Sequence, residues 1–527
     1  MASFKRLTQV MLSGASCAAL AACGASDIAS PGTGGNVTIN NVTPAPTPTP
    51  TPTPTGVTPA GGCPTIASDQ GTITGTTGTY RVCRLPNLIT SSISLPKVAG
   101  LLYELNGRVN VGCDGGFAAP TAAAPVASTT IGCGNLTADT AVTLTIAPGV
   151  ILYGSTGQSW LAVNRGNQVQ AVGTAAAPIV FTSRDNVLGI NDDTSQGQWG
   201  GVVLMGRGVV TDCNVGSTAA NTCERDTEGA ADLARFGGTN NAYNAGRMSF
   251  VQIRYSGFVL GANRELQALT TEGIGTGTVL NNIQSHNSSD DGAEFFGGAI
   301  NMKYYIATGA DDDSLDVDTG AQMNVQYALL LPRATKGDAL FEIDSNGLET
   351  DLPRTRLNVA NFTAIQSVAS ADNEANDLAA ALFRGNSDTT LVNGLIITPN
   401  NECIRMNGSG TTPVTLAVRS VAMQCNATKY LGSGTLTAAQ VAAAFATGTN
   451  NNNDSFTASL ANVFINGANE TAVVGTDPKT INAFFDTTTW AGAVRNSTDT
   501  WYAGWTCNSA TVNFGAGSTS CTSLPTT

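Results

Sequence analysis

Short segments in which apolar and polar residues alternate begin near Ala141 and fill the middle of the chain. In the first segment Val142, Leu144 and Ile146 fall on one face. Later segments repeat the alternation at Leu161 and Val163, at Val169 and Ala171, and at Ile179 and Phe181. Glycine and proline separate the segments, which are too short for helices and read as strands. The pattern predicts the sides of a β-helix.

Two stretches farther along the chain match each other at an offset of 22 residues. Asp290-Asp291-Gly292-Ala293-Glu294-Phe295 aligns with Asp312-Asp313-Ser314-Leu315-Asp316-Val317. A repeat of this length indicates stacked coils, because each coil buries its inward side chains against its neighbours. The same offset places carboxylates of one coil over carboxylates of the next.

Three segments depart from the coil pattern. Residues 212–244 form a polar insertion that we expect to project from one side. Residues Ala375 to Leu382 and Leu436 to Ala446 carry apolar residues at helical spacing, and Thr435 or Thr437 could cap the second helix. We expect these helices to be caps or decorations, because a solenoid needs covered ends.

The N-terminal residues resemble a bacterial lipoprotein signal. Lys5 and Arg6 precede a short apolar segment that ends in Leu20-Ala21-Ala22-Cys23. The resemblance implies that Cys23 is lipidated, and Gly24 after it implies delivery to the outer membrane. An ordinary secretory signal cleaved near Ala22 is the alternative. No other segment is long and apolar enough to span a bilayer.

A stalk is predicted after this signal. From Thr43 to Pro59 proline and threonine alternate almost without interruption, which favours extended polyproline II. The segment either lifts the next domain away from the lipid surface or serves as a passive spacer.

Ten cysteines remain once Cys17 and Cys23 are set aside. They fall as sequence neighbours: Cys63 and Cys83, Cys113 and Cys133, Cys213 and Cys223, Cys403 and Cys425, Cys507 and Cys521. Such local spacing in an exported chain favours five disulfide loops over a metal site, although sequence alone does not fix the connectivity.

Composition excludes several classes of function. Charged residues are 12% of the chain and the formal net charge is −13, which argues against nucleic acid and anionic head groups as partners. His286 is the single histidine, so a multi-histidine metal site is excluded. We expect it to be a buried coil or corner residue, the alternative being a serine-histidine-aspartate triad built around it. Nucleotide-binding and zincin motifs are absent from the sequence.

The candidate chemistry lies in a cluster of eleven carboxylates within 55 residues. They are Asp290, Asp291, Glu294, Asp311, Asp312, Asp313, Asp316, Asp318, Asp338, Glu342 and Asp344. Stacked carboxylates repel unless a cation, an arginine or a proton intervenes. Ligands that are all oxygen suit a hard ion, so the sequence predicts a Ca²⁺ site. Its predicted ligands are Asp290, Asp291, Asp312 and Asp313, with Asp316 as outer support.

A second interpretation of the same carboxylates is structural. They would cap corner amides and face water, or pair with basic residues. The candidate basic partners are Arg254, Arg264, Lys303 and Lys336.

Several motifs resemble a family of bacterial surface lipoproteins with right-handed parallel β-helices. They include Ala147-Pro148-Gly149-Val150-Ile151-Leu152-Tyr153-Gly154, Trp199-Gly200-Gly201-Val202-Val203-Leu204 and the closing Trp501-Tyr502-Ala503-Gly504-Trp505-Thr506. The resemblance runs from roughly Gly100 to the C-terminus. It implies an all-β, right-handed parallel β-helix with small caps and short decorating helices, and it implies work beside a TonB-dependent receptor.

The expected organisation has five parts: a signal peptide at 1–22, a lipid-anchored stalk at 23–62, a disulfide-bearing N-terminal cap at 63–140, the β-helix at 141–430, and C-terminal coils with a helix and a Trp-rich cap at 431–527. The expected function is non-catalytic binding or adhesion at the cell surface, with a polymeric or small ligand such as a polysaccharide. A polysaccharide lyase or glycoside hydrolase, with Lys303 or Arg264 as a base in a lyase, is the first alternative. A structural surface-layer component is the second.

Overall fold

The computed structural model describes residues 56–525, apart from 229–231, 262–263, 346–349, 371–377 and 409–411. The signal peptide, Cys23 and most of the stalk lie outside the described residues. Residues 54–527 form one compact unit. Among the described residues, no helix has the length and apolar character needed to cross a membrane.

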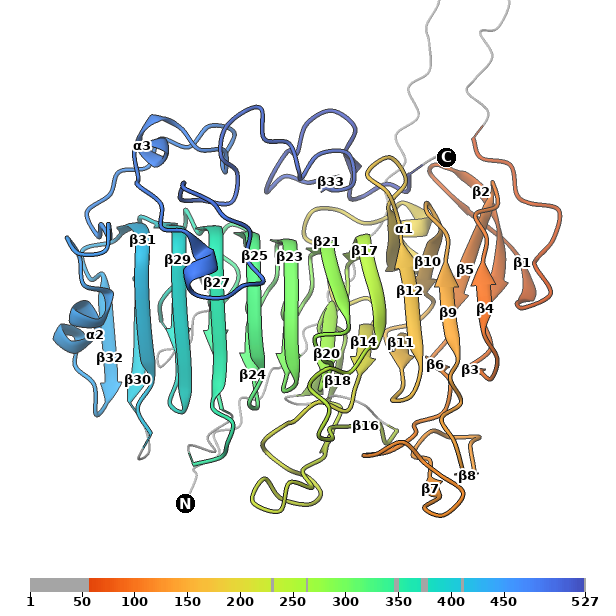
Figure 1. Ribbon diagram of the computed structural model, residues 1–527. Coiled ribbons are helices and arrows are strands. Elements are labelled where there is room, and N and C mark those ends of the chain that lie inside the picture. Colours follow the sequence, from red (N-terminus) through yellow and green to blue (C-terminus); the bar gives the residue numbers. More distant parts are fainter. Residues whose placement is uncertain are drawn as a thin grey trace, which may run out of the picture. The chain divides into compact units, whose positions relative to one another are not determined.

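Two long sheets make up the solenoid, and their strands stand side by side in Figure 1. The larger, sheet A, runs through β1 (Ser68–Gly75), β2 (Gly78–Arg84), β5 (Leu101–Leu105), β10 (Ile151–Gly154), β13 (Ile179–Ser183), β17 (Gly246–Arg254), β21 (Val279–His286), β23 (Ala299–Thr308), β25 (Gln322–Leu331), β27 (Thr355–Ile365), β29 (Ser387–Thr398) and β31 (Thr415–Cys425). A branch of β4 (Ile93–Leu95), β9 (Thr143–Ile146) and β12 (Gln168–Val172) joins it at β17. Apart from the β1–β2 hairpin, these strands pair in parallel.

Sheet B forms the opposite side of each coil and carries the candidate site. Its order is β3 (Leu88–Ile89), β6 (Arg108–Val111), β11 (Trp160–Val163), β14 (Gly201–Met205), β20 (Leu269–Glu272), β22 (Ala293–Phe296), β24 (Asp316–Asp318), β26 (Phe341–Ile343), β28 (Ala381–Phe383), β30 (Ile404–Gly408) and β32 (Tyr430–Gly434). The chain is therefore an all-β parallel β-helix, as predicted.

The core forms by stacking of like positions from coil to coil. On sheet B, Phe295 pairs in register with Val317, Val317 with Ile343, and Ile343 with Phe383. All four side chains are fully buried. Since strand side chains alternate between faces, the neighbouring positions point outward, and these carry the carboxylates.

Every long strand of sheet A from β17 onward bends at one residue with positive φ. These residues are Phe250, Asn282, Tyr304, Tyr327, Asn361, Asn393 and Ser420, with φ between 51° and 64°. They stack from coil to coil, since the residues on either side of them pair in register. Asparagine tolerates this left-handed conformation better than most residues, which accounts for its recurrence here.

The smaller elements lie at the ends and sides. Two-stranded pairs are β7 (Val126–Ala127) with β8 (Asn135–Leu136), β15 (Arg225–Asp226) with β16 (Arg235–Phe236), β18 (Val259–Gly261) with β19 (Arg264–Glu265), and β33 (Cys507–Asn508) with β34 (Thr519–Ser520). The helices are α1 (Arg184–Leu188), α2 (Ala438–Phe445), α3 (Ala468–Thr471) and a 3-10 turn at Pro478–Thr480. Helix α2 begins after the capping box of Thr437 and Gln440 and packs Val441 and Phe445 against the last coil.

Within the described residues, five disulfides join the cysteines that are neighbours in the sequence. They are Cys63–Cys83, Cys113–Cys133, Cys213–Cys223, Cys403–Cys425 and Cys507–Cys521. Cys213–Cys223 closes a loop within the insertion of residues 212–244.

Three features of the solenoid differ from the sequence-based expectation. Parallel pairing begins at β2 and β5, well before residue 141, so most of the predicted N-terminal cap consists of coils. Within the predicted helix Ala375–Leu382, residues 375–377 are not described, while Ala381 and Leu382 lie in strand β28. Pairing with β26 and β30 on both sides favours the strand there and overrides the helical spacing.

The Trp-rich segment also differs, because it covers a side of the solenoid and not an end. Residues 454–525, here called the C-terminal strap, run back along sheet A from β31 toward the N-terminal coils (Figure 1). Near the start of the strap, the Phe456 backbone N–H donates a hydrogen bond to the Met423 carbonyl of β31. Near its end, the Asn186 side chain donates to the Cys521 carbonyl. The strap covers an outward apolar stripe, and of its tryptophans Trp505 is fully buried there while Trp490 and Trp501 are partly exposed.

Candidate functional site

The site begins with one outward-facing position of sheet B. Glu294 in β22 pairs in register with Asp316 in β24, and Asp316 pairs with Glu342 in β26. Adjacent parallel strands lie about 4.8 Å apart, so the three carboxylates stack closely. The preceding position of this column is Thr270 and the following one is Leu382, so the acidic column is confined to three coils.

A second set of aspartates lies at the corner that leads into these strands. The Oδ1 of Asp291 accepts a hydrogen bond from the Asp313 backbone N–H at 2.9 Å, and the Oδ1 of Asp313 accepts one from the Ala339 N–H at 2.7 Å. Each aspartate thereby caps the corner of the next coil. The structural interpretation of the acidic cluster accounts for one oxygen of each of these two residues.

Together the column and the corner line an acidic groove of about 660 Å³. Twelve carboxylates and one lysine line it, along with Gln267 and Ser289. The charged residues are Glu228, Glu265, Asp290, Asp291, Glu294, Asp311, Asp312, Asp313, Asp316, Asp318, Glu342, Asp344 and Lys336. All five predicted metal ligands lie in this groove. Glu228 and Glu265 lie outside the repeated coils, so the 22-residue offset gave no signal for them.

Burial and mutual repulsion disfavour the ionised forms of these carboxyls. Burial, and next the charge of Asp312, raises the pKa of Asp290 well above its ordinary value; burial and Asp290 do the same for Asp291. The pKa values of Glu294, Asp313 and Asp316 are raised by the same two causes. Burial raises the pKa of Asp318 to about 7, and Asp344 adds to the rise.

The opposing effect of an arginine is visible at one end of the groove. Burial raises the pKa of Glu342 to about 7 even though the Arg384 guanidinium lies beside it. The Nε of Arg384 is 2.8 Å from Glu342, and its Nη1 is 3.1 Å from Asp344. Arg333 and Lys336 both contact Asp311 at another edge, at 2.6 and 3.4 Å. These cations are too few to neutralise the twelve carboxylates.

Of the four basic partners proposed from the sequence, Lys336 alone is found at the groove among the side chains that the structure describes. Lys303 lies on sheet A and pairs with Asp486 of the strap at 2.7 Å. Arg254 is fully buried and donates to the carbonyls of Cys521 and Ser523. The side chain of Arg264 is outside the described part. Lys303 is therefore excluded as a base at this site, because its strand belongs to the other sheet.

His286 belongs to the opposite side of the solenoid. It is fully buried, its Nδ1 lies 3.0 Å from the Thr308 hydroxyl, and its ring meets Tyr255 edge-on. Burial lowers the pKa of His286 to about 3. His286 is thus a buried coil residue, as expected from the sequence. The residues described around it give no support to the alternative of a serine-histidine-aspartate triad.

The carboxylate oxygens of the groove converge closely enough for a cation. Three sets have ligand atoms within 4.8 Å of one another. They are Asp290, Asp291 and Asp312; Asp291, Glu294 and Asp316; and Asp312, Asp313 and Asp338. The buried Oδ1 of Asp316 has no hydrogen-bond donor among the described residues. The donor set is entirely oxygen, mostly carboxylate, and partly shielded from water, which fits Ca²⁺.

A family model described as a pectate-lyase like beta helix domain matches residues 130–506, well over half of the chain. The chain belongs to this family. The matched residues of this pectate-lyase-like β-helix include every residue of the acidic groove. Comparison with curated proteins and with solved structures gave no match.

Proposed function

We propose that this pectate-lyase-like β-helix is a binding module that holds Ca²⁺ in the acidic groove and captures a polysaccharide there. The observation that carries the proposal is the convergence of oxygens from Asp290, Asp291, Glu294, Asp312 and Asp316 across adjacent coils. A cation relieves the repulsion between these carboxylates. Because the fold already holds them close together, they can bind the cation with little rearrangement.

Bound Ca²⁺ would change what the groove accepts. Twelve carboxylates repel an anionic sugar, whereas a cation with open coordination positions attracts carboxylate and hydroxyl oxygens. Asp291 and Asp313 hold the corners in place through their backbone bonds. Asp290 and Asp312 complete one converging set of oxygens with Asp291, and Glu294 and Asp316 complete another.

Calorimetric titration of chelator-stripped protein tests the proposal. We expect Ca²⁺ to give a binding heat and an upward thermal shift, and Mg²⁺ to bind more weakly. Asp290→Asn and Asp312→Asn should each weaken Ca²⁺ binding by about tenfold or more, the effect of ~1.4 kcal/mol. Asp69→Asn, an exposed carboxylate of β1, is the matched control. Neither heat nor thermal shift at millimolar Ca²⁺ would reject the calcium site.

We also propose that the module is a lipoprotein held at the outer membrane by acylated Cys23, with the stalk between lipid and solenoid, and that it serves a TonB-dependent receptor. The support is the sequence around Cys23 and the Pro-Thr segment. Labelling cells with an alkyne fatty acid tests the anchor: the label should reach the wild-type chain and be lost from Cys23→Ser. Co-purification with a receptor after crosslinking tests the partner.

A catalytic function is the second candidate, favoured by the family match and by carboxyl pairs of raised pKa. Glu342, with a pKa of about 7, could donate a proton to a leaving group as in glycoside hydrolases. Lys336, which lines the groove, is the candidate base for a lyase reaction. Absorbance of unsaturated products and release of reducing ends from uronate polymers test this candidate, and sustained turnover would replace the binding proposal.

A further inference from the structure

A second cavity lies on the N-terminal coils of the solenoid, apart from the acidic groove. It has a volume of about 350 Å³, at the small end of the range of ligand pockets. Its lining is formed by Asn87, Leu88, Gly107, Arg108, Asn110, Ile131, Gln158, Trp160 and Asp232. We call it the Arg108 pocket. It shares no lining residue with the acidic groove.

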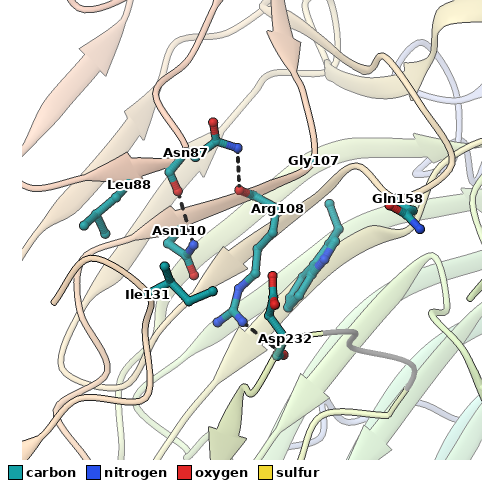
Figure 2. A pocket seen from close by; sticks show the side chains of 9 residues that line it. Asn87, Leu88, Gly107, Arg108, Asn110, Ile131, Gln158 and Asp232 are labelled. Carbon is teal, nitrogen blue, oxygen red and sulfur yellow. Dashed lines mark hydrogen bonds between the residues drawn. The ribbon is translucent and has the colours of Figure 1, made fainter.

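The charged floor of the Arg108 pocket is held in one position. The Arg108 guanidinium lies 4.7 Å from the centre of the Trp160 ring. Its Nη1 donates to the carbonyls of Asp232 and Leu233 at 3.4 and 3.1 Å, and its Nη2 donates to the Asn164 Oδ1 at 3.2 Å. Figure 2 shows Arg108 reaching toward Asp232, with Leu88 and Ile131 to one side and Gln158 to the other. A cation fixed by stacking and three carbonyl-type acceptors needs no rearrangement to receive a ligand.

Neutral amides form the upper edge of the pocket. The Nδ2 of Asn87 donates to the carbonyls of Asn106 and Arg108, at 2.8 and 3.0 Å, which orients the side chain. Its Oδ1 receives no hydrogen bond within the described chain, and neither end of the exposed Gln158 amide is engaged there. The pocket therefore offers both acceptors and donors at positions open to solvent.

Apolar surface adjoins these amides. The Ile131 side chain is 70% exposed, and Leu88 lies beside it on the pocket wall. One positive and one negative side chain line the cavity, so neither an anion nor a cation is favoured by charge. A small ligand with hydroxyl groups around its edge and C–H groups on a face matches an amide rim beside an isoleucine.

We infer that the Arg108 pocket binds one or two rings of a neutral sugar. The hydroxyls would bond to Asn87, Gln158 and Asp232, and the C–H face of the ring would pack on Ile131. The inference is independent of the calcium proposal, because no predicted calcium ligand lines this pocket and no cation is needed there.

The insertion of residues 212–244 contributes side chains to both the Arg108 pocket and the acidic groove. Asp232 of the insertion lines the Arg108 pocket, while Glu228, four positions earlier, lines the acidic groove. Between the two cavities, the buried Phe236 and Ala234 pack on Trp160, Val203 and Phe296 of sheet B. A polymer that contacts the groove could thus place a neutral unit in the pocket on the other side of the insertion.

Saturation-transfer NMR and calorimetry on the full-length protein test the inference. The probes are the methyl glycosides of glucose, galactose and mannose, with methyl glucuronide as the anionic comparison, all in EDTA. We expect at least one neutral glycoside to bind, and to bind better than the glucuronide. Asn87→Ala and Gln158→Ala should each weaken that binding about fivefold or more, the scale of one lost hydrogen bond. The exposed Gln158 amide makes no hydrogen bond within the described chain, so Gln158→Ala should melt like the wild type. Asn87→Ala also loses two bonds to backbone carbonyls, so Gln158→Ala is the variant that separates lost binding from lost stability.

Gln70→Ala, an exposed amide on β1, is the control and should bind like the wild type. Binding of none of the three glycosides would overturn the inference, and so would tighter binding of the glucuronide or unchanged binding by both pocket variants. A repeat with Ca²⁺ in place of EDTA completes the test: neutral-sugar binding that occurs with Ca²⁺ and not in EDTA would also overturn the inference, and would assign the sugar to the calcium site instead.

Discussion

At the residue scale, Arg165 is a buried charge that carboxylates of two other segments enclose. It is 1% exposed, and its Nε and Nη2 contact the two oxygens of Asp114, which is equally buried, at 2.6 and 2.8 Å. Its Nη1 contacts Glu224 of the insertion at 2.5 Å. This network joins a coil, the segment around Asp114 and the insertion, and so fixes the insertion to the coils.

Arg165→Ala leaves Asp114 buried without its partner. We expect the free energy of unfolding to fall by about 3–5 kcal/mol, as for other broken buried pairs. Arg81→Ala breaks the exposed pair with Asp69 and should cost about 0–1 kcal/mol. Urea denaturation measures both, and an equal cost for the two variants would contradict the role assigned to Arg165.

Glu272 gives a pH-dependent stability. It is fully buried, its Oε2 accepts a hydrogen bond from the Thr227 hydroxyl at 2.8 Å, and its Oε1 has no donor among the described residues. Burial raises the pKa of Glu272 to about 8, against the ordinary 4.5. The folded chain thus holds a proton that the unfolded chain releases, and stability is lost as the pH rises from about 4.5 to 8.

Glu272→Gln should remove this loss, because an amide keeps the shape and carries no charge at any pH. We expect the variant to unfold like the wild type near pH 4 and to be the more stable protein at pH 8.5. The difference should grow by up to about 1.4 kcal/mol per pH unit in between. Thermal melts across this range, in EDTA so that the acidic groove is equal in both proteins, measure it. A difference that stays constant with pH would show that Glu272 does not titrate in this interval.

At the element scale, the bends of sheet A connect the solenoid to the strap. Asn393 bends β29 with φ of 53°, its Nδ2 donates to the Thr476 carbonyl at 2.8 Å, and its Oδ1 accepts from the Thr476 N–H at 2.8 Å. Asn361 bends β27 and donates to the Trp490 carbonyl. An asparagine at this position therefore serves two purposes: it adopts the left-handed backbone and it binds the strap.

Substitutions at Asn393 separate the two purposes. Asn393→Gly keeps the backbone conformation and loses the strap bonds, whereas Asn393→Ala loses both. We expect alanine to destabilise by about 1–2 kcal/mol more than glycine, the cost of a left-handed residue with a Cβ. Chemical denaturation of the pair measures the gap. Alanine equal to or better than glycine would mean that the bend carries no strain.

The elements visible in the sequence are those that follow the coil period. Alternation and the 22-residue offset are local signals, so the strands and the stacked aspartates could be predicted. Helix α2 departs from the coil period, but helical spacing and a threonine cap are local signals too. Glu228 could not be placed at the groove, because its position depends on how the insertion folds across sheet B. Strand β28 was missed for the same reason: its pairing with β26 and β30 comes from residues far away in the sequence.

At the scale of the whole described unit, the strap covers an apolar surface on the outer side of sheet A. One outward column of sheet A reads Gln252, Gln284, Ile306, Leu329, Thr363, Leu395 and Ala422 in register. The two glutamines bind the strap backbone at Trp505 and Cys507, while the apolar members pack against strap side chains. Without the strap this column would be an exposed hydrophobic stripe along several coils.

Trp505 is the side chain whose removal should loosen this cover most. It is fully buried, meets the Phe250 ring edge-on, and donates from Nε1 to the Trp501 carbonyl at 2.7 Å. Trp505→Ala should lower the free energy of unfolding by about 3–5 kcal/mol, and ANS fluorescence should rise before the coils unfold. Val474→Ala changes a strap residue that is 67% exposed and should alter neither measurement. If the strap and the coils unfold as one cooperative unit, ANS binding will appear only with the loss of β-structure in circular dichroism, and the strap must then be counted as part of the core and not as a separable cover.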